Sequence, residues 1–424
     1  MDRILRDAHN FASINIKTQR NEFENYNYDL VKQSVKDASK LGLASVAIPN
    51  EYGGLGGTIF DEVQVVKEMT GYSGSFDTGY IVQAGIGTRP IILFGNEEQK
   101  RKYVRRIASG DIFGSFALTE PDAGSDINNA TTVARLTNTG YEITGQKTFI
   151  SNAGWADFFI VFAKIDNDKN LSAFIVDAKS KGISLGPEFK KMGIRSSSTR
   201  SVFLDKVYVS EENLLGKRGG GFKIAMATLN LGRLKLSAAV LSAGKRALNY
   251  AQEYARGREQ FGKAVLSYPI IKKKIKKSRR ELDKLEIAID RTARDIDNAI
   301  QGGKNKVEVL KEFAGETAIL KVYASEVASK AVDESMQIMA GQGFMDDHPI
   351  EAMYRDSRIT RIYEGTNEVC RLQALRYIDK LSWIEKVWIN IVMGKALREA
   401  KRGPEHVSVR LFKLSDWLIK KYVR

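Results

Sequence analysis

Hydrophobic and polar positions follow a helical rhythm through the first part of the chain. In segments 31–43 and 60–72, apolar residues recur every three or four positions, which is the spacing of an amphipathic helix. A glycine-rich loop, 48–57, separates the two segments. The pattern predicts an N-terminal helical domain that covers residues 1–112.

The pattern changes between about residue 113 and residue 216. Short runs of β-branched and aromatic residues alternate with turn residues, which is typical of strands. The runs are 131–137, 141–150, 158–165, 172–177 and 200–209. Several short strands at this spacing predict a middle β domain, 113–216, built as a compact β-barrel or sandwich.

From residue 217 onward the pattern is helical again. The long segments are 219–258, 269–300 and 307–339. The glycines 219–221 before the first of them could bind a phosphate at a helix N-terminus or form a hinge between domains. Helices on either side of a β-rich part predict an α+β protein rather than alternating βαβ units. We expect a C-terminal helical domain at 217–380 and a basic helical tail at 381–424.

Composition narrows the class of protein. One Cys and three His in 424 residues exclude a disulfide framework, and we expect no metal site. No run of about 18 apolar residues is present, so no membrane span is expected. The first residues lack the apolar core of a secretory signal. These features favour a reducing compartment, either the cytoplasm of a prokaryote or the mitochondrial matrix of a eukaryote.

The formal net charge is +15, and much of it lies in 272–280 and in 380–424. These basic runs are either solvated helix faces or surfaces that attract an anionic partner, such as a nucleotide-like cofactor, an acidic protein or lipid headgroups. No zinc-finger spacing or aromatic RNA-binding signature accompanies them, so no nucleic acid is expected.

One carboxylate stands at an irregular junction. Glu364 lies between Tyr363 and Gly365, and the residues from 367 onward have helical spacing with Thr366 as N-cap. A glycine just before a cap lets the backbone turn sharply. Glu364 is therefore expected at a turn rather than on a solvated helix face.

Six segments give this turn a context. In chain order they are ALTEPDAGSD (117–126), FISN (149–152), KMGIRSSSTRSVFLDKVYV (191–209), RGREQFG (256–262), QIMAGQGFM (337–345) and RDSRITRIYEGTNE (355–368). Together they resemble the acyl-CoA dehydrogenase family of flavoenzymes. The very-long-chain branch is the most similar, on GIRSSSTRSVFLDKVYV, LLGKRGGGFKIAM and NLGR.

The resemblance implies a fold and a reaction. The fold would have an N-terminal helical domain, a middle β-barrel domain and a C-terminal four-helix bundle. FAD would lie between domains and against a neighbouring subunit, in a homodimer or homotetramer. The reaction would be α,β-dehydrogenation of a medium- to long-chain acyl-CoA to the trans-2-enoyl-CoA in fatty acid β-oxidation. Electrons would pass to an electron-transferring flavoprotein.

The resemblance also assigns residues. Glu364 matches the catalytic base, and its backbone N–H would hold the thioester oxygen together with a ribityl hydroxyl of FAD. The implied FAD contacts are Phe116, Leu118, Thr119, Phe149, Ser151, Arg258, Phe261, Gln337, Gly341, Thr366 and Asn367. Of these, Arg258, Gln337 and Gly341 would reach the FAD of the neighbouring subunit. Phe149 replaces the family's usual Trp, and Ala340 replaces a usual glycine.

Substrate contacts are implied for five residues. Ser125 would touch the CoA arm, Asn230 and Arg233 would lie near the CoA nucleotide, and Tyr363 and Gly365 would flank the acyl group. Gly232 stands where other branches carry a glutamate base, which leaves Glu364 as the candidate base and leaves room for an acyl chain.

Two other functions stay open at this point. An acyl-CoA oxidase would pass electrons to oxygen, and a non-enzymatic assembly protein could retain the same fold. The tail, 381–424, resembles the start of the extra C-terminal region of the very-long-chain branch. It would either pack on the bundle or contribute peripheral membrane contact.

Overall fold

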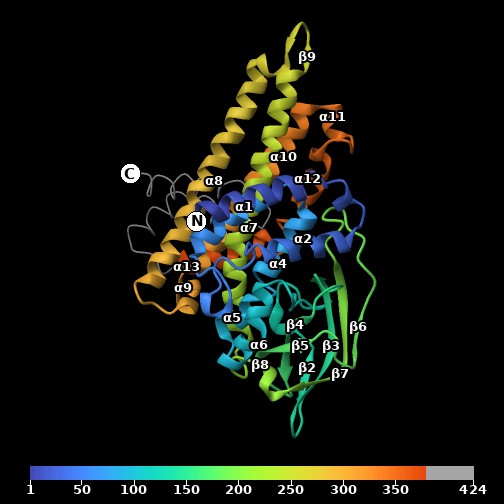
Figure 1. Ribbon diagram of the computed structural model, residues 1–424, viewed down its shortest axis with the longest axis vertical. Helices are drawn as coiled ribbons and strands as arrows, with labels where there is room; N and C mark the ends of the chain where they lie inside the picture. Colours follow the sequence, from blue (N-terminus) through green and yellow to red (C-terminus); the bar gives the residue numbers. More distant parts are fainter. Residues whose placement is uncertain (379–424) are drawn as a thin grey trace, which may run out of the picture.

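The computed structural model describes residues 1–378, so the expected basic tail, 381–424, lies outside the described residues. The described residues follow the expected order of helical, β-rich and helical parts (Figure 1). The α+β fold with its three parts is therefore confirmed. Short helical turns occur at Ala12–Ile16, Glu22–Glu24, Asn50–Tyr52, Ile127–Asn129, Glu211–Asn213 and Val265–Ser267.

The N-terminal part is helical. Its helices are α1 (Asp2–Phe11), α2 (Tyr28–Lys40), α3 (Ile59–Met69), α4 (Gly74–Ala84), α5 (Arg89–Phe94) and α6 (Glu97–Ala108). Reciprocal capping boxes start two of them, Thr58 with Asp61 at α3 and Asn96 with Gln99 at α6. Every residue of α4 after Gly74 is buried, so this helix belongs to the core of the molecule.

The middle part is one eight-stranded mixed sheet in the order β6-β7-β3-β2-β4-β5-β8, with β1 parallel to β4. The strands are β1 (Gly114–Ala117), β2 (Val133–Leu136), β3 (Gly140–Ser151), β4 (Phe158–Ile165), β5 (Leu171–Asp177), β6 (Ile183–Leu185), β7 (Thr199–Ser210) and β8 (Leu214–Leu215). No strand pair among residues 1–378 links β6 to β8, so hydrogen bonds do not close the sheet there.

Strand β4 shows why its sequence is continuously apolar. Phe158, Ile160 and Phe162 pack in a cluster that includes residues of α5, α6 and α7. Phe159 and Val161 point to the other face, where they pack with residues of β3, β5 and β7. Side chains alternate between the faces of a strand, so both faces of β4 are buried.

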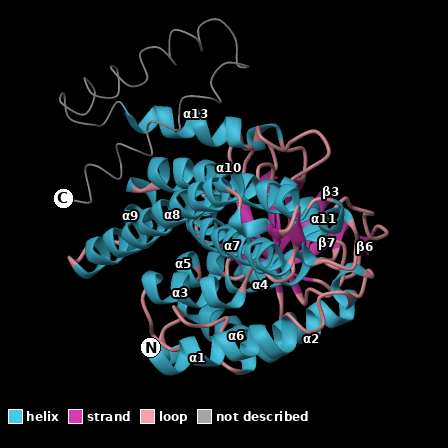
Figure 2. Ribbon diagram, turned by 90° about the horizontal axis from the view of Figure 1, so that it is seen from above, coloured by secondary structure: helices cyan, strands magenta, loops and turns pink. Residues whose placement is uncertain are grey.

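The C-terminal part is a helical bundle. Its elements are α7 (Gly221–Gly257), the short hairpin β9 (Glu259–Gln260) and β10 (Lys263–Ala264), α8 (Pro269–Gln301), α9 (Lys306–Glu312), α10 (Ala314–Met339), α11 (Gly341–Phe344), α12 (Pro349–Ile359) and α13 (Asn367–Ile378). Helix α10 packs along α7, α8 and α13. Figure 2 shows the resulting layers, which run from α13 through α10 and α7 to α3 and α1.

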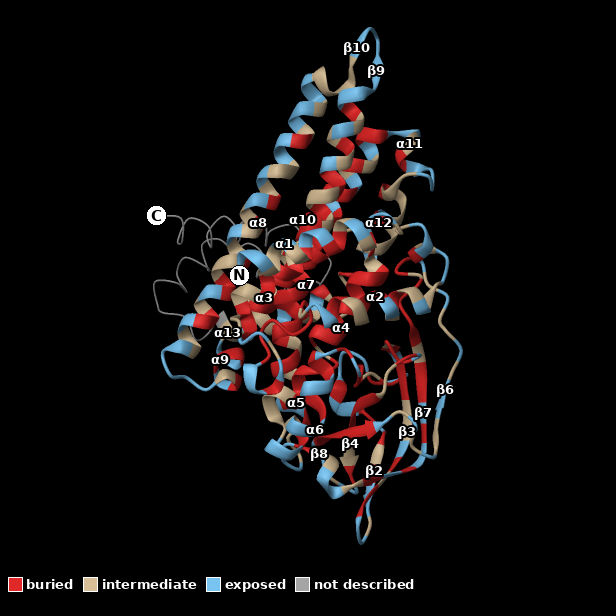
Figure 3. Ribbon diagram, viewed as in Figure 1, coloured by how far each residue is buried: buried red, intermediate tan, exposed pale blue. Residues whose placement is uncertain are grey.

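Helix α7 lies at the centre of the bundle, and most of its middle is buried (Figure 3). Among residues 1–378 it alone has the length and apolar composition to cross a membrane, and 89% of that stretch is buried inside the fold. Such burial is typical of the core helix of a folded bundle.

Two details differ from the expected elements. The predicted helix 307–339 is divided into α9 and α10 at Phe313, where the backbone leaves helical geometry (φ −84°, ψ 8°). The short strands β1, β6 and β8 were not predicted. They have two to four residues, and so few positions show no alternation that a sequence pattern could reveal.

Candidate active site

The Glu364 turn joins α12 to α13 and places a carboxylate where the backbone is irregular. Glu364 has a φ of +57° and Gly365 has a φ of +91°. A residue with a Cβ is strained by about 1–2 kcal/mol in this left-handed region, whereas glycine adopts it freely. Thr366 caps α13, because its Oγ1 accepts a 3.3 Å hydrogen bond from the Val369 N–H. The expected turn and N-cap are confirmed.

Two buried cations hold the carbonyl oxygens of this turn. Arg233 Nε donates to the Glu364 carbonyl oxygen at 2.9 Å, and Lys321 Nζ donates to the Gly365 carbonyl oxygen at 2.7 Å. Burial lowers the pKa of Lys321 to about 8. Hydrogen bonds from charged donors are strong where water is excluded, so α7 and α10 together fix the turn.

Asn230 supports this arrangement from within α7. Arg233 Nη1 donates to Asn230 Oδ1 at 3.2 Å and to Gln373 Oε1 at 2.7 Å, while Asn230 Nδ2 donates to the Leu310 carbonyl oxygen at 3.0 Å. Both Asn230 and Arg233 are buried. The structure shows their contacts with the Glu364 turn and with each other, and contact with the CoA nucleotide stays a prediction.

The carboxylate of Glu364 faces Gly232. A Cβ at Gly232 would lie 2.8 Å from Oε1 and 2.9 Å from Oε2, so a side chain there would displace the carboxylate. Oε2 is buried and has no hydrogen-bond partner among residues 1–378. Burial raises the pKa of Glu364 to about 7, although Arg233, Lys321 and Lys235 act in the opposite direction. A carboxylate of this kind can accept a proton near neutral pH.

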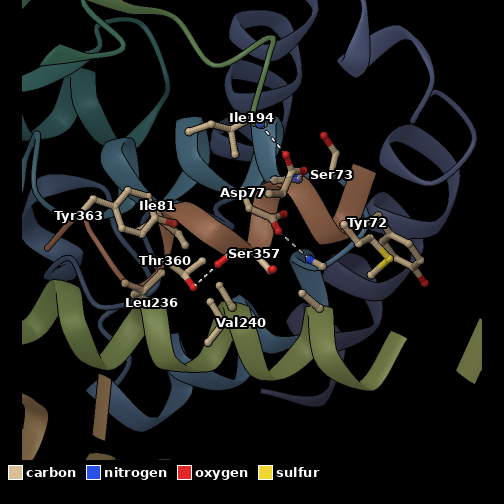
Figure 4. A pocket seen from close by; sticks show the side chains of 16 residues that line it. Tyr72, Ser73, Asp77, Ile81, Ile194, Leu236, Val240, Ser357, Thr360 and Tyr363 are labelled. Carbon is tan, nitrogen blue, oxygen red and sulfur yellow. Dashed lines mark hydrogen bonds between the residues drawn. The ribbon is translucent and has the colours of Figure 1, made fainter. Parts of the chain in front are cut away.

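A cavity of about 50 Å³ lies beside this turn, between α4, α7 and α12 (Figure 4). Tyr363, the residue before Glu364, lines one end of it. The Tyr363 ring packs against the core cluster, and burial raises its pKa well above the ordinary value. A phenol with a raised pKa is a poor proton donor, so Tyr363 is suited to line the cavity by packing, as the sequence predicted.

Several residues predicted for FAD gather where β1 and β3 end. Phe116 and Leu118 are buried, and their contact with FAD stays a prediction. The Thr119 carbonyl oxygen accepts a 2.9 Å hydrogen bond from the Thr148 N–H. Next to it, Phe149 has a φ of +56° and its side chain is 64% exposed. Ser151 is half-buried on the same strand.

A second group lies at the other end of the bundle. Phe261, 95% exposed, lies between β9 and β10, far from the sheet (Figure 1), and Arg258 precedes β9 and is exposed. Gln337 and Gly341 are exposed where α10 meets α11. Within one chain these elements are not brought together with β3, which carries Phe149, and the contact with a neighbouring subunit stays a prediction.

Ala340, the residue that replaces a usual glycine, adopts φ +51° and ψ −136°. This conformation is nearly specific to glycine, so the substitution leaves local strain.

The remaining predicted residues have distinct environments. Ser125 is exposed in the loop after β1. Thr366 is occupied as the N-cap of α13. Asn367 is buried, and its Oδ1 accepts from Lys321 Nζ at 2.9 Å while its Nδ2 donates to Ser325 Oγ at 3.0 Å. The side chain of Asn367 is therefore directed into the bundle, and its contact with FAD stays a prediction.

Two functional features were missed in the sequence. Lys321 holds the Glu364 turn through the Gly365 carbonyl oxygen, and the sequence signal for this contact is a lysine among the apolar positions of α10. Glu120 and Lys147 form a buried ion pair of 2.7 Å that anchors the loop after β1. Burial opposes ionisation of Glu120, yet Lys147 and hydrogen bonds from Thr131 and Thr132 lower its pKa to about 2.

The exposed groups suit a flavin dinucleotide. The rings of Phe149 and Phe261 are apolar surfaces that a planar ligand can cover. Arg258 has no side-chain hydrogen bond to another described residue, and a guanidinium group can bind a pyrophosphate through two parallel bonds. The residue types present on β3 and around the β9–β10 hairpin thus fit the ring and the pyrophosphate of FAD.

Three family models match consecutive parts of the chain. They are acyl-CoA dehydrogenase N-terminal domain (2–111), middle domain (115–207) and C-terminal domain (219–378). A curated acyl-CoA dehydrogenase of Bacillus subtilis is 37% identical over 82% of this chain and 89% of its own length. The chain belongs to the acyl-CoA dehydrogenase family.

Other members of the family are longer than this chain. A probable acyl-CoA dehydrogenase of Bacillus subtilis is 39% identical over 87% of this chain but only 64% of its own length. The very-long-chain specific enzyme of Bos taurus is 36% identical over 80% of this chain and 52% of its own length. The chain therefore spans between about half and two thirds of these two relatives.

Solved structures of acyl-CoA dehydrogenases share the fold. An acyl-CoA dehydrogenase complexed with FAD from Bacillus anthracis has a TM-score of 0.86 and 38% identity, over 89% of this chain and 68% of that chain. The butyryl-CoA dehydrogenase of Megasphaera elsdenii has a TM-score of 0.82 and 32% identity, over 88% and 96% of the two chains.

Proposed function

We propose that this acyl-CoA dehydrogenase family member binds FAD and converts acyl-CoA to trans-2-enoyl-CoA, with Glu364 as the base that removes the α-proton. The observation that carries the proposal is the state of the Glu364 carboxylate. Its Oε2 is buried without a partner, and its pKa is raised to about 7. A free glutamate is too weak a base to remove a proton from carbon. Burial raises the pKa of its carboxyl group and so makes it a stronger base.

The rest of the turn positions the reacting groups. Arg233 and Lys321 donate hydrogen bonds to the carbonyl oxygens of Glu364 and Gly365. These bonds fix the backbone from which the Glu364 side chain extends. The Glu364 N–H donates to no acceptor within residues 1–378, which leaves it free for the thioester oxygen. One such donor is typically worth about 3–4 kcal/mol in the transition state. The acceptor for the hydride that leaves the β-carbon is supplied by FAD when it is bound.

The finer assignments rest on the same resemblance. Medium- to long-chain acyl-CoA is the proposed substrate class, because Leu236, Val240 and Ala243 give α7 an apolar face along the cavity beside the Glu364 turn. An electron-transferring flavoprotein is the proposed electron acceptor. A homodimer or homotetramer is proposed because the β9–β10 hairpin, which carries Phe261, lies far from β3, which carries Phe149, within one chain (Figure 1).

Location and membrane contact are proposed from the sequence alone. A single Cys favours the cytoplasm of a prokaryote or the mitochondrial matrix of a eukaryote. The basic tail, 381–424, is the proposed site of peripheral membrane contact, because clustered lysine and arginine residues are attracted to anionic lipids.

One experiment tests the reaction. Purified protein is titrated without oxygen with acyl-CoAs of graded length, and bleaching of the flavin absorbance is followed for wild type and Glu364→Gln. We expect bleaching by wild type and none by the variant. Near wild-type bleaching by Glu364→Gln would contradict the assigned base. Peroxide formed in air without an added acceptor would indicate an oxidase, and a colourless protein would indicate a non-enzymatic assembly role.

A further inference from the structure

The cavity beside the Glu364 turn continues along one face of α7. Gly232 contacts the carboxylate, and Leu236, Val240 and Ala243 line the cavity four, eight and eleven residues later. Positions with this spacing share a helix face. They lie roughly 6 to 17 Å along the helix axis from Gly232. If Glu364 takes a proton from an acyl-CoA, as proposed above, the distal part of the acyl chain runs toward this cavity.

A carboxyl group that is only half satisfied lines the cavity. Asp77 lies on α4, is 9% exposed, and lines the hollow opposite α7 (Figure 4). Its Oδ2 accepts a 2.8 Å hydrogen bond from the Gly71 N–H. Its Oδ1 is buried and has no partner among residues 1–378. A buried polar atom without a partner is unfavourable, so the site is incomplete as it stands.

The charged neighbours of Asp77 form no hydrogen bond with its Oδ1. Arg246 donates to the carbonyl oxygens of Thr70 and Glu68 at 2.8 and 2.9 Å, and stacks 3.6 Å from the Tyr72 ring centroid. Asp356, also in the cavity wall, accepts from the backbone N–H groups of Gly74 and Ile194. Asp356 is therefore satisfied by backbone donors.

The protonation state indicates what kind of group would complete the site. Burial raises the pKa of Asp77 well above its usual range, and the charge of Asp356 acts in the same direction. The Gly71 N–H and Arg246 oppose this shift. A carboxyl that keeps its proton can both donate and accept a hydrogen bond, and a hydroxyl can do the same, so the two groups are complementary.

We propose that Asp77 is a specificity residue that binds a hydroxyl group on the distal part of the acyl chain. A purely apolar chain in the cavity leaves Asp77 Oδ1 dehydrated and unpaired. A chain with a hydroxyl at that depth completes the hydrogen bonding. Sites that pair a substrate hydroxyl discriminate against analogues that lack it, because the buried partner is then left alone.

The test compares matched substrates on the FAD-loaded protein. Each saturated acyl-CoA of a graded length series is paired with the same chain carrying a terminal hydroxyl, and kcat/KM is measured with a dye acceptor. At the length that reaches Asp77, we expect the hydroxylated member to be preferred by about tenfold or more. Asp77→Ala is expected to remove the preference by improving use of the unsubstituted chain.

Two further variants keep the test decisive. Asp77→Asn preserves size and hydrogen bonding, so it should retain part of the preference even if Asp77→Ala fails to fold. Asp297 is equally buried at 9% exposed, but its oxygens accept from the N–H groups of Ile59 and Phe60 away from the cavity. Asp297→Asn should leave the preference unchanged.

The outcomes separate this inference from the function it rests on. Flavin bleaching without a preference at any chain length would overturn the role of Asp77 and leave the dehydrogenase proposal standing. A preference that survives undiminished in either Asp77 variant would also overturn it. If no acyl-CoA of either series bleaches the flavin, both proposals fail.

Discussion

Glu364→Gln replaces an acid whose Oε2 is buried with a neutral side chain of nearly the same shape. The variant therefore separates the proposed chemical role of Glu364 from its effect on stability. Dehydrogenation should fall by at least about a hundredfold, because the base is gone. The effect on stability has the opposite sign. Burial that makes Glu364 a useful base also makes its ionised form unfavourable in the folded protein.

The magnitude follows from the pKa. The ordinary value is 4.5 and the folded value is about 7. Each unit corresponds to roughly 1.4 kcal/mol, so ionising Glu364 in the folded protein costs about 3 kcal/mol more than in the unfolded chain. Between the two values the folded state holds more protons than the unfolded state. The free energy of unfolding of wild type therefore falls as the pH rises through this window.

Urea denaturation of wild type and Glu364→Gln checks the reasoning, with both proteins FAD-loaded and at equal concentration. The difference in unfolding free energy should shift in favour of the variant by about 2 kcal/mol between about pH 5 and about pH 7. A difference that does not change with pH would refute the raised pKa. Asp297→Asn, a change at another buried carboxyl group, should not reproduce the loss of dehydrogenation.

Three other changes probe the surroundings of the site. Gly232→Ala places a Cβ 2.8 Å from Glu364 Oε1 and should lower kcat by about a hundredfold, whereas Gly257→Ala meets no atom within 4 Å and should not. Lys321→Met removes a donor from the catalytic turn and should lower the urea midpoint by the equivalent of about 1–3 kcal/mol, together with kcat; unchanged values of both would contradict its positioning role. Glu120→Gln leaves a buried lysine without its counter-charge and should destabilise the protein by about 3–5 kcal/mol near neutral pH. Because the Glu120 pKa is lowered to about 2, this stability is present above about pH 4.5 and is lost as the pH falls toward 2, so the difference should shrink in acid.

The spacing of apolar and polar residues along the sequence was enough to predict most of the fold. The strands β3, β4, β5 and β7 and the helices α7 and α8 have enough positions for their spacing to be read, and each was predicted within a few residues. Two-residue strands such as β8 have no such signal, and they form because neighbouring strands offer hydrogen bonds.

The site depended on both motif and geometry. The turn at Glu364 and its cap could be predicted because glycine permits a sharp turn and threonine is a preferred N-cap residue. The contacts of Arg233 with this turn join residues 131 positions apart, and those of Lys321 join residues 44 positions apart. No local pattern reports such pairs. The half-satisfied carboxyl of Asp77 was likewise hidden in an apolar-looking helix.

The uninterrupted length of α7 limits how this protein can change. One 37-residue helix carries Gly232, the α7 residues that line the cavity and the segment before the β9–β10 hairpin. Inserting a single residue would rotate everything after it by about 100° and shift it by about 1.5 Å. An insertion just after Gly232 would turn Leu236, Val240 and Ala243 away from the cavity. It would also move the segment that carries Arg258 and Phe261. On α7 itself, we therefore expect changes of substrate preference to come from exchange of individual side chains at constant helix length.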